Sequence, residues 1–513
     1  MKRPSPDDGF VGAVDRRLRD WEREDLPRRI WSKDSSLWPS ASSEEVIDRM
    51  GWLGLPESMT ERIDEIEEFA DEVRDDGLRR VVLLGMGGSS VAAAVLSRVF
   101  PRSRGALELR PLDTTHPDAV RIAVRDADLT KVLFVVSSKS GTTIEPHALL
   151  EYFWDRCERA RAPAGRQFVA ISDAGTPLAQ IAEARGFRRC FVAPGDVGGR
   201  FGALTEFGLV PAALTGAPIR KVLESAEKMA GSCRPSVPAL ENPALRLGAE
   251  LGESAASGRD KLLFFTTPAI SAFPPWAEQL VAESTGKDGR GLIPVLGGML
   301  PSGGTRAPDA TAVAISTSKE EDAAWTGGLD RIESDGTPVI RFRVRRREDI
   351  GGEFFRWEFG IVVAAIALGV DPFNQPDVES AKAYAREALR PEGARTADAA
   401  PAPTDAVSAE GLREAGAAWK ALARPRDYLA IQAFLNPSAG VTAALARLGS
   451  VLASSTGLPC TWGFGPAFLH STGQLHKGGP PTGLFLQLID HPSADVAVPG
   501  AAYSMGELRL AQA

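Results

Sequence analysis

Short apolar segments rich in β-branched residues alternate with helical patterns along much of this 513-residue chain. In the first half, such segments occur near residues 80–84, 107–110, 132–136, 168–171 and 190–192. Strands that alternate with helices form parallel sheets with helices on both faces. The alternation therefore predicts a doubly wound α/β fold, whose ligands lie at the carboxyl ends of the strands.

Two polar loops follow two of these predicted strands. The first is GMGGSS (Gly85 to Ser90) and the second is SKSGTT (Ser138 to Thr143), and a helical pattern begins after each. Hydroxyls, backbone N–H groups and a helix N-terminus at one point suit a phosphate monoester. A Ser/Thr-rich helix cap is the alternative for the second loop. For the first, the alternative is a dinucleotide fingerprint with Glu108 as the ribose acid, although Ser90 stands where its third glycine belongs.

Similar alternation continues to the end of the chain, with strands expected near residues 260–267, 312–316, 339–344, 428–435 and 460–464. Residues 391–408 are rich in Ala, Pro, Thr and Asp, which is typical of a flexible linker. We therefore expect a helical N-terminal arm (1–57), a first α/β domain (58–216), a second α/β domain (217–390), the linker (391–408) and a C-terminal segment that completes the second domain (409–513).

Candidate catalytic side chains stand beside glycine-rich segments. Arg200 lies among three glycines, where a backbone can approach a ligand, although an arginine that caps a helix is the alternative. Gln279 and Glu283 are four residues apart on an expected helix, 274–285, so they share one face. Glu283 is a candidate general base, although a glutamate at a helix end is commonly just solvated. Three of the five histidines follow Leu469, so a site that needs a histidine from the second half must take it from there.

The composition excludes several classes of function. A net charge of −8 without any basic block argues against a nucleic-acid or membrane surface as partner. The four cysteines have no paired spacing, so we expect neither a zinc site nor a disulfide framework. The N-terminus lacks the apolar core of a signal peptide, and the longest apolar run, Phe359 to Val370, is too short to span a bilayer. These features predict a cytoplasmic protein.

Taken together, the motifs resemble the glucose-6-phosphate isomerase family, whose members have two sugar-isomerase (SIS-type) α/β domains. The resemblance lies in Gly85 to Ser89, Ser138 to Thr143, GGRF (Gly198 to Phe201), QLVAESTGKDGRG (Gln279 to Gly291) and DPFNQPDVESAK (Asp371 to Lys382). RIWSKDSSLW (Arg29 to Trp38) and LHSTGQLHKGG (Leu469 to Gly479) are most similar to the isomerase half of fused transaldolase/glucose-6-phosphate isomerases. The chain is too short for an added transaldolase barrel, so the resemblance implies isomerase activity alone.

The resemblance implies a role for each matched residue. Glu283 would move a proton between C2 and C1 of the sugar through a cis-enediol, and Arg200 would offset the charge of the enediolate. Lys382 and a histidine would help to open the pyranose ring, and the match favours His470 over His476. Substrate contacts would come from Gly88, Ser89, Ser138, Lys139, Ser140, Thr142, Thr143, Gln279 and Gln375.

The scheme implied by the resemblance needs no metal and no cofactor. In this family a neighbouring subunit lends the histidine, so the resemblance also implies a homodimer, acting in glycolysis or gluconeogenesis. Two alternatives remain beside the strict isomerase. One is an isomerase that also accepts mannose 6-phosphate, against which Gln375 argues because dual-specificity relatives carry a smaller residue there. The other is a non-catalytic SIS-type sensor of sugar phosphates, which would not need Glu283, Arg200 and Lys382 together.

Overall fold

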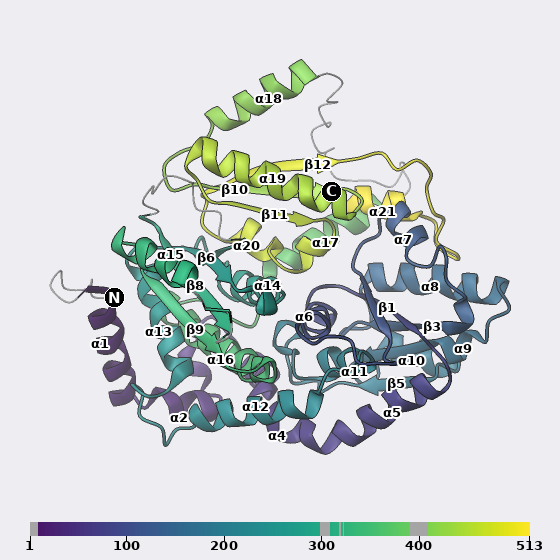
Figure 1. Ribbon diagram of the computed structural model, residues 1–513, viewed down its shortest axis with the longest axis horizontal. Helices are drawn as coiled ribbons and strands as arrows, with labels where there is room; N and C mark the ends of the chain where they lie inside the picture. Colours follow the sequence, from purple (N-terminus) through teal and green to yellow (C-terminus); the bar gives the residue numbers. More distant parts are fainter. Residues whose placement is uncertain (1–8, 298–307, 318–319, 322, 390–408) are drawn as a thin grey trace.

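Three parallel β-sheets and the helices that cover them make up the computed structural model of this protein (Figure 1). It describes residues 9–297, 308–317, 320–321, 323–389 and 409–513. The predicted linker, 391–408, lies outside these residues. The predicted α/β class with parallel sheets is confirmed, since every strand pair within the three sheets is parallel.

The first sheet brings the two polar loops together. Its strand order is β2-β1-β3-β4-β5, with β1 (Arg80–Gly85), β2 (Glu108–Leu112), β3 (Val132–Ser137), β4 (Phe168–Ser172) and β5 (Arg189–Val192). The chain passes from β1 to one side and returns to the other side at β3, so the direction of winding reverses between these neighbours. Gly85 and Ser137 are paired at their carboxyl ends, so the GMGGSS and SKSGTT loops start side by side at the expected ligand crevice.

Helices cover this sheet on both faces (Figure 1). The helices of this part of the chain are α5 (Ile63–Asp75), α6 (Val91–Val99), α7 (Pro117–Ile122), α8 (Ile144–Arg159), α9 (Ala164–Gln167), α10 (Pro177–Ala184) and α11 (Glu206–Leu214). The short helix α4 (Leu55–Ser58) and a 3₁₀ turn at Met59–Arg62 precede α5.

The second sheet has the order β7-β6-β8-β9. Its strands are β6 (Lys261–Thr266), β7 (Ile293–Val295), β8 (Ala310–Thr317) and β9 (Val339–Val344), and its helices are α12 (Ile219–Ser232), α13 (Pro243–Ala256), α14 (Pro274–Thr285), α15 (Ala323–Ser334), α16 (Ile350–Leu368) and α17 (Pro376–Ala388). Helix α16 includes most of the apolar run near Phe359 and is buried along most of its length. Helix α14 lies between the two sheets in Figure 1 and carries the predicted base.

The C-terminal segment forms a sheet of its own, in the order β11-β10-β12. It contains β10 (Tyr428–Phe434), β11 (Cys460–Phe464) and β12 (Gly483–Ile489), with helices α18 (Ala409–Ala421), α19 (Ala439–Thr456), α20 (Gly473–Gly478) and α21 (Met505–Gln512). Tyr428, Ala430 and Leu475 share an apolar cluster with Leu263 and Ile293 of the second sheet. The segment is therefore attached to the second sheet by packing and not by strand pairing.

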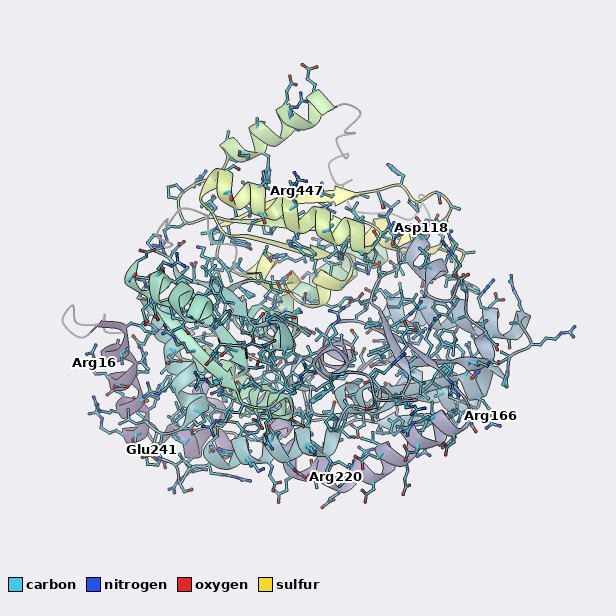
Figure 2. The ribbon with its side chains drawn as sticks, in the orientation of Figure 1. Arg16, Asp118, Arg166, Arg220, Glu241 and Arg447 are labelled. Atoms are coloured by element: carbon cyan, nitrogen blue, oxygen red, sulfur yellow. The ribbon has the colours of Figure 1, made fainter. Side chains whose placement is uncertain are left out.

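The N-terminal arm packs on the main body through aromatic side chains. It contains α1 (Gly9–Arg23), α2 (Leu26–Trp31) and α3 (Ser43–Ile47). Trp52 is fully buried and stacks on Phe201, next to the candidate Arg200, with ring centroids 5.8 Å apart. Trp38 meets the edge of Phe373. Charged side chains such as Arg166, Arg220 and Glu241 lie on the periphery instead (Figure 2).

Candidate active site

Glycines allow three distant segments to touch at the candidate site. A Cβ atom at Gly88 would lie 2.1 Å from the carbonyl oxygen of Gly199. The backbone of the GMGGSS loop is therefore in contact with the backbone of GGRF (Gly198 to Phe201), which we call the arginine segment. Gly87 has a φ of +52°, and a Cβ there would lie 2.5 Å from the carbonyl oxygen of His470. Only glycine fits both the conformation and the space. These contacts place the arginine segment and the C-terminal histidine beside the first loop.

The guanidinium of Arg200 and the carboxylate of Glu283 form a buried ion pair. Arg200 Nη1 donates to Glu283 Oε1 at 2.8 Å, and the two residues are 5% and 7% exposed. Arg200 Nε donates to Ser284 Oγ at 2.9 Å, while Nη2 donates to the carbonyls of Pro372 and Asn374. A guanidinium with this many partners is fixed in place, so the carboxylate at the end of α14 has a set direction.

Gln279 extends this pair toward the histidine. Its side chain lies one helical turn before Glu283, and Nε2 donates to Glu283 Oε2 at 3.0 Å and to the carbonyl oxygen of His470 at 2.9 Å. The shared helical face predicted from their spacing is present. Both oxygens of Glu283 are therefore bound, one by Arg200 and the other by Gln279.

The imidazole of His470 pairs with a buried carboxylate that sequence reasoning missed. His470 Nε2 lies 2.7 Å from Glu145 Oε1, and Glu145 is 1% exposed. Burial acts to raise the pKa of Glu145, but the charge of His470 and the hydrogen bond to it outweigh burial and lower that pKa. Gln512 Nε2 donates to the same oxygen. The available signal was an acidic residue in the first turn of α8, directly after the polar loop.

His476 has a different environment from His470. Its ring lies among Tyr428, Phe468 and Phe485, and burial lowers its pKa to about 3. Its Nδ1 is 3.2 Å from Gln432 Nε2. A histidine that stays neutral at pH 7 among aromatic rings is a poor proton donor, whereas the imidazole of His470 lies against the carboxylate of Glu145.

The second polar loop opens onto a cavity of about 1120 Å³. Ser140, Thr142, Thr143, Glu145 and His470 are among the residues that line it. Such a volume accommodates a small ligand, and the α8 N-terminus with its hydroxyls offers hydrogen-bond donors to an anion.

Within this loop the hydroxyls are hydrogen-bonded to one another, Ser138 to Thr143 at 3.1 Å and Ser140 with Thr142 at 3.0 Å. Lys139 forms an ion pair with Asp173. Ser89 is buried below the loop and its carbonyl accepts from Ser137 Oγ. The loop hydroxyls are thus gathered at one place, whereas the ammonium of Lys139 is engaged by Asp173.

The motif DPFNQPDVESAK (Asp371 to Lys382) contacts Arg200 through the turn that precedes α17. The carbonyls of Pro372 and Asn374 accept from Arg200, and Gln375 directly precedes the helix. Lys382 belongs to α17, but its side chain lies outside the part of the structure that is described. The turn that precedes α17 is therefore hydrogen-bonded to Arg200 of the Arg200–Glu283 ion pair.

Glu108 does not occupy the position that a dinucleotide site requires. It is the first residue of β2 and is paired with Arg80, the first residue of β1. Its carboxylate forms ion pairs with Arg80 and Arg110. The GMGGSS loop begins at the opposite end of β1, so Glu108 cannot hold the ribose of a dinucleotide bound at that loop.

Within the described residues, no three His, Cys, Asp or Glu side chains are grouped as metal ligands would be. In the same residues, no helix combines the length and apolar character needed to cross a membrane.

Comparison with known proteins places the chain in a family. No protein-family model matches it. The glucose-6-phosphate isomerase of Symbiobacterium thermophilum is 30% identical over 385 residues, which are 65% of this chain and 85% of that relative. The chain belongs to the glucose-6-phosphate isomerase family. The glucose-6-phosphate isomerase of Parabacteroides distasonis is 28% identical over 65% of this chain and 86% of its own length.

Solved structures agree with the fold of glucose-6-phosphate isomerases. A hypothetical protein from Thermus thermophilus superposes with a TM-score of 0.64 and 24% identity, over 75% of this chain and 98% of that one. A glucose-6-phosphate isomerase from Chlamydia trachomatis superposes with a TM-score of 0.55 and 18% identity, over 64% of this chain and 72% of that one. The predicted SIS-type α/β fold is thereby confirmed.

Proposed function

We propose that this protein interconverts D-glucose 6-phosphate and D-fructose 6-phosphate through a cis-enediol or enediolate. The observation that carries the proposal is the buried Arg200–Glu283 pair, which Gln279 links to His470 beside the two polar loops. Proton abstraction next to a carbonyl needs a positioned carboxylate and a fixed cation where negative charge develops on oxygen. This constellation supplies both within a single chain.

In the proposed reaction, Glu283 takes the proton from C2 of the open-chain aldose and returns it to C1. Arg200 stabilises the enediolate oxygen. His470, held by Glu145, gives a proton to the ring oxygen as the C1–O5 bond breaks, and the C1 hydroxyl loses its proton to solvent as the aldehyde forms. Lys382 assists this step. Because microscopic reversibility applies, the same groups serve the ketose-to-aldose direction.

Recognition of the substrate is divided between two ends of the site. The phosphate is held by Ser89 and by the loop residues Ser138, Lys139, Ser140, Thr142 and Thr143, with Gly88 giving the backbone room to approach. Gln279 and Gln375 contact the sugar hydroxyls. Since Lys139 is paired with Asp173, it exchanges this partner for the phosphate when the substrate binds.

The direct test is the conversion of fructose 6-phosphate into glucose 6-phosphate by the purified protein, with and without a chelator. We expect turnover that the chelator leaves unchanged. Absence of turnover with retained binding of the sugar phosphate would contradict the proposal and favour the sensor. Equal turnover of mannose 6-phosphate would show dual specificity instead of strict specificity. Tight binding of NAD or NADP would favour the dinucleotide site considered for the first polar loop.

Several finer expectations accompany this proposal. We propose that the protein is a homodimer that works in the cytoplasm, in glycolysis or gluconeogenesis. We also propose the domain limits given above and a close relationship to the isomerase half of the fused transaldolase proteins. These expectations rest on the motifs, and solution scattering, fractionation of cells and phylogenetic comparison would test them.

A further inference from the structure

A second buried cation lies next to Arg200. Lys287 is in the glycine-rich segment after α14 and is 3% exposed. Its Nζ donates to the carbonyl oxygen of Asp371. Its backbone N–H donates to the carbonyls of Thr285 and Arg290, at 2.9 and 3.0 Å, which closes a tight turn. The backbone of Lys287 is therefore held by hydrogen bonds, and its ammonium contacts the turn that begins at Asp371.

Lys287 and Arg200 hold the same turn from two sides. Arg200 binds the carbonyls of Pro372 and Asn374, and Lys287 binds that of the preceding residue, Asp371. A carbonyl dipole that accepts from a buried cation is held strongly, because water does not compete. Two cations on three carbonyls fix the turn and hence the residue that follows it, Gln375.

The start of α17 is attached to the same glycine-rich segment. Gln474 Nε2 donates to the carbonyl oxygen of Gly286 at 3.0 Å, and Gln474 Oε1 accepts from the backbone N–H of Asp377 at 3.1 Å. Lys287 and Gln474 thus attach both ends of the segment 371–377 to the residues that directly follow α14. Displacing this attachment would move Gln375 and α17 relative to Glu283.

The ammonium also balances a buried negative charge. Asp371 is 2% exposed, its Oδ1 accepts from the N–H of Phe373, and its Oδ2 has no hydrogen-bond partner among the described residues. A buried carboxylate oxygen without a partner is costly unless a positive charge lies nearby. Lys287 is such a charge, since Asp371 is among the groups that favour its protonated form.

We propose that Lys287 is a positioning residue: it fixes the Asp371–Asn374 turn beside Arg200, so that Gln375 and α17 keep their places at the sugar. The proposal rests on the isomerase function proposed above, and it assigns Lys287 no contact with the substrate. Loss of the ammonium is expected to raise KM through Gln375 and to lower kcat through Lys382 and the charge around Glu283.

The charge of Lys287 is expected to titrate near neutral pH. Burial and the neighbouring Arg200 lower its pKa to about 7, while Asp371, Glu283 and Glu45 of α3 act in the opposite direction. In the unfolded chain the lysine holds its proton up to its ordinary pKa of 10.5. The contribution of this group to stability therefore rises with pH from about 7 toward 10.5, where the unfolded chain binds more protons.

Lys287→Met tests the proposal, with Lys261→Met as its matched control. Lys261 is equally buried, but its ammonium is paired with Asp260 and Asp309 at the start of β6, away from the site. We expect kcat/KM of Lys287→Met to fall roughly 10- to 100-fold, as when groups that orient a functional residue are removed. Lys261→Met is expected to lower stability and to leave kcat/KM unchanged.

The pH profile separates positioning from general damage to the fold. The wild-type profile of kcat/KM is expected to contain an ionisation near pH 7, where the enzyme loses the charge of Lys287. Lys287→Met is expected to have a low kcat/KM and a pH profile without this ionisation. Lys287→Arg keeps a positive charge at every working pH. Its pH profile is also expected to lack the ionisation near pH 7, but its kcat/KM is expected to be higher than that of Lys287→Met.

Hydrogen exchange of the segment 371–388 gives a readout that does not depend on activity. We expect faster exchange there in Lys287→Met than in Lys261→Met. An inactive wild type would refute the proposed isomerase function, whereas the exchange would still decide whether Lys287 holds the turn. Wild-type kcat/KM, pH profile and exchange in Lys287→Met would overturn the role of Lys287.

Discussion

Both carboxylate oxygens of Glu283 are hydrogen-bonded, and this determines how the residue can act. Arg200 binds one oxygen and Gln279 the other. A carboxylate held in this way has a fixed direction, which favours proton transfer to and from one position. The neighbouring Glu278 has neither of these partners. It lines a second cavity of about 740 Å³, to which Gln279 and Gly87 also contribute, and burial raises its pKa to about 8.

Glu145 holds the imidazole of His470, so its substitution is expected to lower activity. Glu145→Gln removes the carboxylate that orients the imidazole, so we expect kcat/KM to fall roughly 10- to 100-fold. The control is Glu151→Gln, on the same helix, whose carboxylate pairs with the half-buried Arg185 outside the site. Steady-state kinetics of both variants decide: equal losses, or none in Glu145→Gln, would refute the role of Glu145.

At the scale of elements, close contact between loops depends on glycine. Gly88→Ala places a Cβ atom 2.1 Å from the carbonyl oxygen of Gly199, which forces the GMGGSS loop and the arginine segment apart. We expect a loss of roughly 1–3 kcal/mol in unfolding free energy from overpacking and a loss of activity. Gly54→Ala is the control, since a Cβ there meets nothing within 4 Å. Thermal unfolding at matched pH compares the two, and equal stability would contradict the contact.

Elements determined by local patterns could be predicted from the sequence, whereas long-range pairings could not. The strands β9 and β11 and the helix α14 were predicted with the bounds that the structure shows, because apolar periodicity and flanking glycines and prolines are local signals. The three-residue strand β7 and the edge strand β12 were not predicted. The pairing of Glu145 with His470 spans 325 residues, and no spacing rule covers such a distance.

At the scale of the whole molecule, one chain brings His470 from its C-terminal segment to Gln279 and Glu145. The family resemblance implied a histidine from a neighbouring subunit, yet His470 of the same chain contacts Gln279 and Glu145. The C-terminal sheet packs on the second sheet in Figure 1 and carries His470 to the first polar loop. A dimer is therefore not needed to complete this arrangement.

Co-expression of Glu283→Gln with His470→Ala tests assembly within one chain. Each inactive chain lacks one of two groups, so sites built within single chains stay incomplete in any mixture. We expect no recovery of activity in mixed oligomers, whose formation is checked with two affinity tags. Recovery of substantial activity would show that the histidine comes from the neighbouring subunit.

Isomerisation of fructose 6-phosphate by wild type, Glu283→Gln and Glu278→Gln tests directly whether Glu283 is the base. Glu278 is a nearby carboxylate on α14 that lines the cavity of about 740 Å³, whereas Arg200 is hydrogen-bonded to Glu283. We expect kcat of Glu283→Gln to fall at least about 100-fold, the lower range for a general base, and that of Glu278→Gln to stay near wild type. Wild-type activity in Glu283→Gln would show that Glu283 is not the base.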